Sequence, residues 1–579
     1  MIIPIVREYF RGLRERDELD VIVPELLTGM GFEVISRPMI GTRQYGADVT
    51  AVGLDTDGVR KLFLFSIKRG DLTRQEWNGA SDQALRPSLD EIKDVVLGER
   101  AVAHRGLPVV ICITLGGVIP ENMQREVKGY IAANSSAELG FQVWSGDTLT
   151  AKIMDGALRE EVFPGEVRAL LRKSAAMVDE HDIAVAYFSE LIERVAATAD
   201  DPISKVRVLY LALWILFVWG REAGSLDAPY EASELVTLRA WELLWRDIEK
   251  DGSRRREPSH VFFEVVQLHL RIWDELYGEK VLPHSAARHA LSFAVGSVNA
   301  VDINVALFET VGRVAMGGLW RLWMEEGQGA APTVSDKVNF PARRIAERLA
   351  EMPAANPTLF SPFADNQGVD LALALLLLCA TPTTRDEARD WVRQTARTII
   401  LSYRFHQRYP TIDGSYANLL RHPVERTEEY RKEMTTGSII LPVLALVAWT
   451  LGDTELVEEV GTFQREAMEH CNFQTWVPNS RTEEGLWHGD RFQGSSIGDL
   501  EVGADGASMI QAIREETLEN EDYRMLSAIR LEHWPLLLLA CRHFRMPVPP
   551  QIWSRLLEEL RPEASQPEAA PEPGEGPSA

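Results

Sequence analysis

The sequence predicts a three-layer α/β domain at the N-terminus, followed by a large all-α region that makes up most of the 579 residues. Two observations predict this fold class. Up to about residue 165, segments with the alternating period of β-strands interleave with segments of helical period. Beyond that point amphipathic helical patterns dominate and strand patterns almost vanish. Because single cores stop growing at about 250–300 residues, we expect several domains.

The N-terminal elements follow from local signals. A helical pattern over residues 14–30 stops at Gly29 and Gly31. Strands are predicted at 32–40, 47–52 and 60–68, and the turn sequence Asp55-Thr-Asp-Gly58 joins the last two into a hairpin. The later elements are a helix at 88–98, a strand at 107–114, a helix near 120–133, a strand at 141–144 and a helix from Asp147.

The all-α region is predicted from apolar residues at three- and four-residue spacing. Helices are expected at 206–219, 234–249, 261–276, 286–298, 307–324, 371–379, 385–404, 439–451 and 524–544. Breaks rich in Gly, Pro, Asn, Ser or Thr divide it at 328–341, 353–368 and 472–506. We expect domains over 1–165, 166–340 and 341–560, the last two either separate or continuous, and a disordered Pro/Glu/Ala tail over 561–579.

The charge balance limits where nucleic acid can bind. The formal net charge is −25, whereas residues 1–165 hold 19 basic and 24 acidic side chains, a net charge of −5. Phosphate binding is driven by Lys and Arg, so the composition excludes a chain that coats nucleic acid over its whole surface. Any DNA contact is expected to be local and confined to the N-terminal domain, while the acidic remainder suits a protein partner better.

The composition also predicts a cytoplasmic protein. Cys112, Cys379, Cys471 and Cys541 are far apart and lie mostly in apolar runs, which is typical of buried free thiols in a reducing compartment. The N-terminus lacks a secretory signal pattern. The longest apolar runs, at 208–219 and 439–451, are shorter than the roughly 18–20 residues that cross a bilayer, so we expect buried core helices and no membrane contact.

The strand at 60–68 carries the candidate chemistry. Alternation places Leu62, Leu64, Ser66 and Lys68 on one face, and both faces are apolar until Ser66. Folding back about the turn brings Asp48 opposite residue 65 or 66, with cross-strand neighbours about 5 Å apart. A carboxylate beside an ammonium at the end of a sheet can hold Mg²⁺ or Mn²⁺ and a water nucleophile, with the lysine stabilising charge on a phosphate.

These residues resemble a known family. Gly46-Ala-Asp48 followed by an apolar strand ending Ser66-Ile-Lys68 is similar to the PD-(D/E)xK motif of restriction-endonuclease-like nucleases, with the Mrr-type restriction enzymes closest. The sequence Gly31-Phe-Glu-Val34 and the later segments Ile111-Cys-Ile-Thr114 and Asp147-Thr-Leu149 also match the Mrr-type pattern. The resemblance covers about residues 14–160. It implies the restriction-endonuclease-like fold and metal-dependent hydrolysis of DNA.

The resemblance also implies further site residues. The acidic residue of the family's first helix falls on Asp20, with Glu18 and Glu25 as substitutes, and would be a second metal ligand or lie behind the first. The departure is Ser66, where the family has Glu or Gln. Serine brings no charge but can hydrogen-bond a metal-bound water. Asp71 and Glu76 are candidates to supply the missing carboxylate.

Four basic residues are candidates for phosphate contacts: Arg37, Arg43, Lys61 and Arg69. The alternative for each is an ordinary solvated charge at the rim of the sheet. Asp48 and Lys68 have the alternative of a simple cross-strand ion pair, and Asp20 that of a solvated helix face.

The sequence therefore predicts a Mg²⁺-dependent DNA endonuclease joined to a helical region that senses, recruits or oligomerises. The resemblance implies prokaryotic defence against foreign DNA as the setting, and a homo-oligomer because cutting both strands usually needs two sites. One alternative is a catalytically degenerate DNA-binding or scaffold module, in which Ser66 marks lost activity. Another is a DNA-repair or junction nuclease, which would prefer branched or damaged DNA.

Overall fold

The computed structural model describes residues 7, 10–11, 13, 15, 19–36, 45–79, 84–96, 98, 104, 106–136, 138–156, 165–250, 255–326, 340–422, 424–489, 493–519 and 521–560. The chain divides into two compact units. The N-terminal unit comprises Met1–Val236 and Glu257–Leu268, and the C-terminal unit comprises Thr237–Arg256 and His269–Ala579. These units do not coincide with the ranges 1–165, 166–340 and 341–560, which stay predictions.

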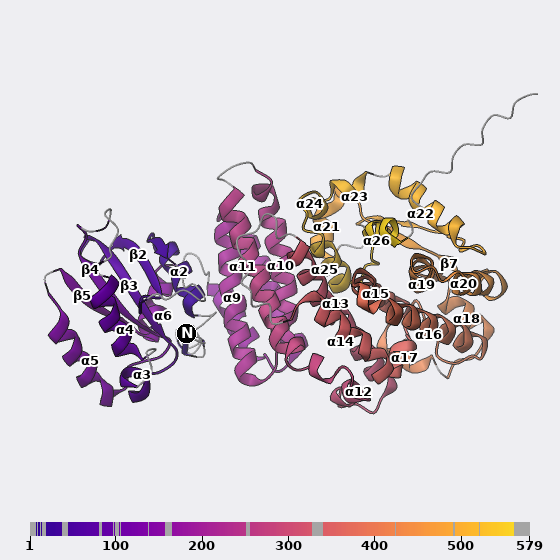
Figure 1. Ribbon diagram of the computed structural model, residues 1–579. Helices are drawn as coiled ribbons and strands as arrows, with labels where there is room; N and C mark the ends of the chain where they lie inside the picture. Colours follow the sequence, from indigo (N-terminus) through magenta and orange to yellow (C-terminus); the bar gives the residue numbers. More distant parts are fainter. Residues whose placement is uncertain are drawn as a thin grey trace, which may run out of the picture. The chain divides into compact units, whose positions relative to one another are not determined.

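The N-terminal unit begins with a mixed α/β domain (Figure 1), and the remainder of the chain is mostly helical, so the coarse order of the predicted fold is confirmed. The described elements of this domain are α2 (Asp20–Gly29), β1 (Glu33–Ser36), β2 (Val49–Leu54), β3 (Arg60–Lys68), α3 (Arg74–Asn78), α4 (Leu85–Glu91), the π-helix η2 (Ile92–Val96), β4 (Val109–Leu115), α5 (Glu121–Asn134), β5 (Leu139–Trp144) and α6 (Gly146–Gly156).

The five strands form one sheet in the order β1-β2-β3-β4-β5. The pairs β1–β2 and β2–β3 are antiparallel, while β3–β4 and β4–β5 are parallel. A parallel pair needs a crossover, which α3 and α4 provide between β3 and β4 and α5 provides between β4 and β5. The carboxyl ends of β3, β4 and β5 therefore meet at one edge of the sheet.

Helices cover both faces of this sheet. On one face Leu62 and Leu64 of β3 pack in a single cluster with Trp77 of α3, Leu89 of α4 and Val127 of α5. On the other face Phe65 meets the ring of Trp144 edge-on at 5.0 Å between centroids. There α2 packs against β2 and α6, and α6 against β5. Because β3 is buried on both sides, polar residues on it are confined to its ends.

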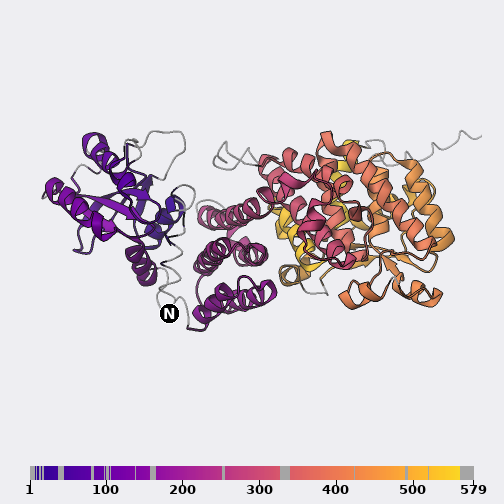
Figure 2. The ribbon, with the colours of Figure 1, turned by 90° about the horizontal axis from the view of Figure 1, so that it is seen from below.

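The N-terminal unit continues with α7 (Gly165–Ala176), α8 (His181–Ala196) and α9 (Pro202–Ala223), and both α10 (Asp227–Ile248) and α11 (Arg256–Trp273) contribute residues to each unit. Figure 1 shows α9, α10 and α11 in magenta, and Figure 2 shows the chain turned by 90°.

The C-terminal unit is formed by helices with a few very short strands. Its described elements are η5 (Asp274–Gly278), η6 (Leu282–His284), α12 (Ala290–Ala294), α13 (Ala300–Glu326), α14 (Ala342–Ala355), η7 (Pro357–Phe360), η8 (Asp365–Gln367), α15 (Gly368–Ala380), η9 (Pro382–Thr384), α16 (Arg385–Arg404), α17 (Tyr416–Arg421), α18 (Glu428–Met434), β6 (Gly437–Ser438), α19 (Ile440–Thr450), α20 (Thr454–Ala467), β7 (Asn472–Phe473), β8 (Thr475–Val477), η10 (Ser480–Thr482), α21 (Glu483–His488), β9 (Ser495–Ile497), α22 (Ala507–Glu519), α23 (Asp522–Met525), α24 (Ser527–Arg530), α25 (Pro535–Phe544), η11 (Pro550–Trp553) and α26 (Ser554–Leu560).

Two of the predicted helices are wrong. The segment 286–298 is helical only over α12, because His289 and Gly296 on either side adopt positive φ, which a helix does not tolerate. The segment 524–544 is broken into three helices, since Glu532 has a φ of 61° and Pro535 then opens α25.

The longest apolar helix, α9, extends beyond the run at 208–219 that the sequence singles out. By length and composition alone, α9 is long and apolar enough to cross a membrane. The same holds for the bent pair of helices over Asp365–Ala380 and Pro382–Arg404 when the two are taken as one span. In its most apolar 18-residue window 61% of α9 is buried inside the protein, as in the core helix of a globular domain. The four cysteines are free and buried, as expected.

Candidate active site

The β2–β3 hairpin brings Asp48 to the carboxyl end of β3. Val49 pairs with Phe65, and the N–H of Asp48 donates to the carbonyl of Phe65 at 2.8 Å, so the next step of the ladder sets Asp48 against Ser66. The Asp48 carboxylate then accepts the N–H of Ile67 through Oδ2 at 2.7 Å. One of its oxygens is thus fixed by the backbone, and the carboxylate lies where β3 ends.

Lys68 is the last residue of β3 and only 7% exposed. Its Nζ donates to Oε1 of Glu15 at 2.7 Å, which forms an ion pair with a part-buried carboxylate. A buried ammonium is costly without such a partner, so Glu15 stabilises both the charge and the position of Lys68. The structure therefore places a charged lysine and two carboxylates around the end of one strand.

Glu15 is a residue that the sequence analysis missed. The resemblance places the acidic residue of the first helix on Asp20, which opens α2 and is half-buried. A signal for Glu15 existed, because Leu19 and Ile22 follow it at four and seven residues, and both are buried. This spacing puts Glu15 on the inward side of the helical pattern. The roles of Asp20 and Glu25 stay predictions, the side chain of Glu25 and all of Glu18 lying outside the described residues.

Ser66 lies opposite Asp48 and two residues before Lys68 on β3, and it is 1% exposed. Its Oγ has no hydrogen-bond partner among the residues that the structure describes. A buried hydroxyl without a partner costs about 1–3 kcal/mol, so its persistence at this position requires an explanation. A polar group bound between Asp48 and Lys68 would satisfy it.

The two carboxylates proposed to replace the missing acid at Ser66 have other contacts. Asp71 accepts the N–H of Val118 through Oδ1 at 3.0 Å and pairs with Arg11 through Oδ2 at 3.0 Å. Glu76 closes a capping box with Thr73 at the start of α3. Both side chains fix the loop after β3, and neither is directed to Ser66 by these contacts.

Of the four residues predicted to contact phosphate, the structure describes two, and one of these, Arg69, lies next to Lys68. Lys61 is the second residue of β3 and lies seven residues before Lys68, which corresponds to roughly 23 Å along a strand. Its ammonium pairs with Asp55 and Asp57 at 2.7 and 2.5 Å, and these carboxylates raise the pKa of Lys61. Lys61 therefore belongs to the hairpin turn and not to the site around Lys68. Arg69 is exposed directly after Lys68, and Arg37 and Arg43 lie outside the described residues.

A divalent cation fits this site in part. Mg²⁺ usually keeps several waters and takes one or two protein carboxylates together with substrate phosphates. Asp48 supplies a carboxylate at the end of β3, and Ser66 supplies a buried hydroxyl without a partner among the described residues. In the described part of the chain, no cluster of three or more His, Cys, Asp or Glu side chains could hold a metal. Asp48 would therefore be the principal protein ligand.

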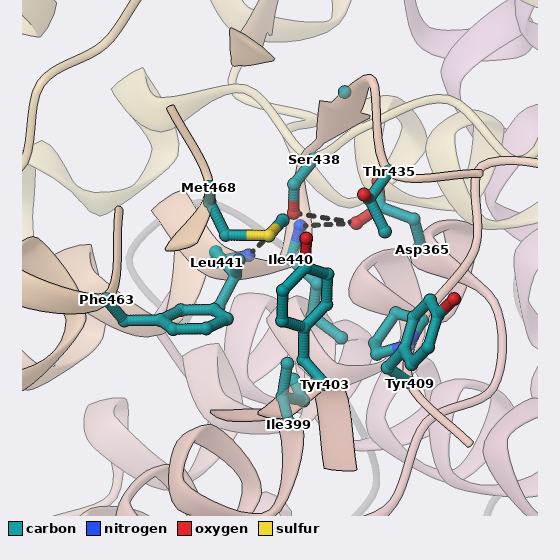
Figure 3. A pocket seen from close by; sticks show the side chains of 12 residues that line it. Asp365, Ile399, Tyr403, Tyr409, Thr435, Ser438, Ile440, Leu441, Phe463 and Met468 are labelled. Atoms are coloured by element: carbon teal, nitrogen blue, oxygen red, sulfur yellow. Dashed lines mark hydrogen bonds between the residues drawn. The ribbon is translucent and has the colours of Figure 1, made fainter. Parts of the chain in front are cut away.

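The C-terminal unit contains a second polar centre, which Figure 3 shows. Asp365 is buried and accepts hydrogen bonds from Ser438 Oγ and Ile439 N at 2.8 Å each, and from Ile440 N at 3.3 Å. Burial raises the pKa of Asp365 to about 6. Its carboxylate thus anchors the start of α19, and the adjoining cavity of about 10 Å³ is the size of one water. This centre stabilises the fold and leaves no room for a substrate.

Comparison with known proteins adds no further constraint. No family model, no curated protein and no solved structure matches the chain.

Proposed function

We propose that the N-terminal domain is a metal-dependent deoxyribonuclease of the PD-(D/E)xK, restriction-endonuclease-like class. The observation that carries the proposal is the shared position of Asp48, Ser66 and Lys68 at the carboxyl end of β3, with Glu15 paired to Lys68. The mixed sheet with helices on both faces is compatible with that fold class, and the sequence resemblance supports it.

Each side chain has a defined task in this proposal. Asp48 would hold Mg²⁺ or Mn²⁺, and the Ser66 hydroxyl would hydrogen-bond a metal-bound water; the ion supplies Lewis-acid stabilisation of the scissile phosphate when bound. The Lys68 ammonium donates hydrogen bonds toward the attacking water and the phosphate oxygens, where negative charge develops. Glu15 keeps the lysine in place. A water adds to phosphorus and gives up a proton to solvent, the P–O bond to one deoxyribose breaks, and the leaving deoxyribose oxygen takes up a proton from solvent.

The test is cleavage of supercoiled plasmid in Mg²⁺ or Mn²⁺ by the wild type, Asp48→Ala and Lys68→Ala. We expect each substitution to lower the rate at least about a hundredfold, the usual effect of removing a group that stabilises the transition state. Lys61→Ala is the matched control, because it removes a lysine from the far end of the same strand. Thermal unfolding of all four proteins separates lost chemistry from lost folding.

One observation favours a second candidate function, a catalytically degenerate module that binds DNA or a protein. Ser66 contributes no charge, and the Lys68–Glu15 pair is closed and largely buried. A folded wild type that fails to cut but binds duplex DNA in a gel shift would favour this module. Cutting that strongly prefers four-way junctions or damaged duplex would instead indicate a repair nuclease, and preference for plain duplex supports a role in defence against foreign DNA.

A further inference from the structure

A cavity of about 180 Å³ lies beside the short hairpin of β8 and β9 in the C-terminal unit. Its volume is eighteen times that of the cavity beside Asp365, 180 against 10 Å³, so it has room for more than one water. We call this cavity the β9 groove. Its lining residues are Val477 of β8, Ser495, Ser496 and Ile497 of β9, Gly498 directly after β9, and Glu516 of α22.

The β9 groove runs along the edge of a strand. Alternation directs Ser495 and Ile497 to one face of β9 and Ser496 to the other. A cavity lined by all three therefore follows the strand edge and does not lie over one face only. In this two-stranded sheet β9 pairs with β8 alone, and the described part of the chain makes no other backbone–backbone hydrogen bond with residues 495–498. The outward N–H and C=O groups of β9 can therefore pair with a further strand.

Contacts on both sides hold this edge in its extended shape. All three residues of β8 are buried, whereas the first two residues of β9 are exposed. Before β9, the indole N–H of Trp476 donates to the carbonyl of Gln493 at 3.0 Å. After β9, the N–H of Asp499 donates to Oδ1 of Asn472 at 2.8 Å. A strand that is fixed before binding loses little conformational entropy when a partner binds, which favours association.

The charge of the β9 groove selects the kind of partner. Glu516 is the one charged side chain among its lining residues, and it is exposed. A partner strand is therefore favoured when it carries Lys or Arg beside Glu516. The C-terminal residues 562–579 of the chain itself do not suit the groove, because they contain four Glu, no Lys or Arg, and five Pro without an N–H to donate.

We propose that the β9 groove binds a basic, extended segment of a partner protein, which adds to β9 as a third strand and places a Lys or Arg side chain beside Glu516. Backbone hydrogen bonds to β9 hold the segment, and Glu516 selects its charge. The composition favours a protein partner for the acidic part of the chain, and the groove gives that partner a place and a chemistry. The inference needs neither DNA nor a metal and stands apart from the nuclease proposal.

The test is hydrogen–deuterium exchange of the full chain with a peptide of alternating Val and Lys, blocked at both ends and about seven residues long. The edge of β9 offers few hydrogen bonds, so we expect a Kd on the order of 0.1–1 mM and titrate the peptide to about 3 mM. The amides of residues 495–498 should exchange more slowly when the peptide is bound. The same peptide with Glu in place of Lys should bind at least about threefold more weakly.

Backbone methylation separates strand addition from simple charge attraction. Two versions of the Lys peptide carry methyl groups on alternate backbone nitrogens, in the two possible phases. Because alternate N–H groups of a strand face its neighbour, one phase should weaken binding about tenfold and the other much less. Equal affinities of the two methylated peptides would overturn the addition of a strand to β9.

A substitution tests the charge selection. Glu516→Gln should weaken binding of the Lys peptide about three- to fivefold, and Glu516→Lys should make the protein prefer the Glu peptide. Glu515→Gln is the matched control, since Glu515 is exposed on the same helix, accepts a hydrogen bond from Gln511 at 2.7 Å and does not line the groove. It should leave the affinity unchanged at physiological salt.

Thermal unfolding of the three variants shows whether each is folded. Absence of protection at residues 495–498 with every peptide would overturn the proposal. Binding of the Lys peptide that both Glu516→Gln and Glu516→Lys leave unchanged, or a wild type that prefers the Glu peptide, would exclude a basic partner in the β9 groove.

Discussion

Both regions of this protein bury polar groups, but the surroundings of those groups differ. In the C-terminal unit the buried Asp370 pairs with Arg545 at 2.5 Å, and the buried Asp365 accepts three hydrogen bonds at the start of α19. In the α/β domain the buried Ser66 hydroxyl has no partner among the described residues, although Asp48 and Lys68 flank it. Neither burial nor an atom without a partner marks a functional site by itself, because Asp370 Oδ1 and Thr395 Oγ1 also lack a partner among the described residues. What distinguishes Ser66 is its place opposite Asp48 and two residues before Lys68 at the end of β3.

The largest loss of stability is expected when a structural ion pair of the C-terminal unit is removed. Arg545→Ala leaves Asp370 buried without its cation, and breaking a buried pair in this way costs about 3–5 kcal/mol. We expect the urea midpoint of the C-terminal unit to fall accordingly, while plasmid cleavage per folded molecule is unchanged. Arg426→Ala, which removes an exposed arginine, is the control and should change stability by less than about 0.5 kcal/mol. Loss of cleavage in folded Arg545→Ala would contradict the separation of roles.

Acid should destabilise the C-terminal unit through His533. Its ring lies between Trp241 and Trp323, with centroid distances of 4.8 and 5.2 Å, and burial lowers its pKa to about 4. The folded pKa of His533 lies below its unfolded value of about 6.5. The stability that the neutral, buried ring contributes is therefore fully present above about pH 6.5 and is lost as the pH falls toward about 4. The loss is on the order of 2–3 kcal/mol.

The check is chemical denaturation of the wild type and His533→Gln at pH 7 and pH 4.5. Because the pKa of Asp365 is raised, this residue increases the free energy of unfolding as the pH falls over part of this range, but it does so equally in both proteins. The stability difference between wild type and variant should therefore narrow at low pH. A difference that stays constant with pH would show that His533 does not titrate in this way.

A smaller effect, on the cleavage rate, is expected when Glu15 of the α/β domain is changed. Glu15→Gln keeps the shape of the side chain but removes the charge that holds Lys68. We expect the cleavage rate to fall about tenfold, which corresponds to an activation free energy higher by roughly 1.4 kcal/mol. Glu15→Asp retains the charge and should recover part of the rate. If Glu15→Gln and Glu15→Asp reduce the cleavage rate equally, the charge of Glu15 does not position Lys68, and the proposed positioning role is contradicted.

A further change tests the Ser66 hydroxyl itself. Because the buried Oγ has no partner among the described residues, Ser66→Ala should raise the free energy of unfolding by about 1 kcal/mol, the lower end of the cost of such a group. Its removal should nevertheless raise the Mg²⁺ concentration needed for half-maximal cleavage. A destabilised variant with unchanged metal dependence would show that the hydroxyl serves the fold.

Part of this structure could be predicted from the sequence. The turn at Asp55–Gly58 between two β-type runs fixes the hairpin, and β3 begins and ends where the pattern places it. The helix α16 also has its predicted ends, since its amphipathic pattern is long and regular. Both elements are determined by local chemistry that repeats over many residues.

The remainder depends on contacts between distant segments. The Glu15–Lys68 pair joins residues 53 positions apart, and no local pattern specifies it. The break at Glu532 uses a left-handed residue without the usual glycine, so Pro535 is the local signal that marks it, and the sequence prediction passed over this proline. The strands β7, β8 and β9 have two or three residues each, too few for a period to be visible. These features follow from tertiary packing.

The most direct test of the central claim asks whether Asp48 binds the metal that supports cutting. In Asp48→Cys a thiolate replaces a carboxylate, and thiolates favour soft cations over Mg²⁺. We predict that this variant is inactive in Mg²⁺ and regains plasmid cleavage in Cd²⁺, while Asp48→Ala is inactive in both. Equal cleavage by wild type and both variants in Mg²⁺, or none by the folded wild type in any metal, would contradict the account.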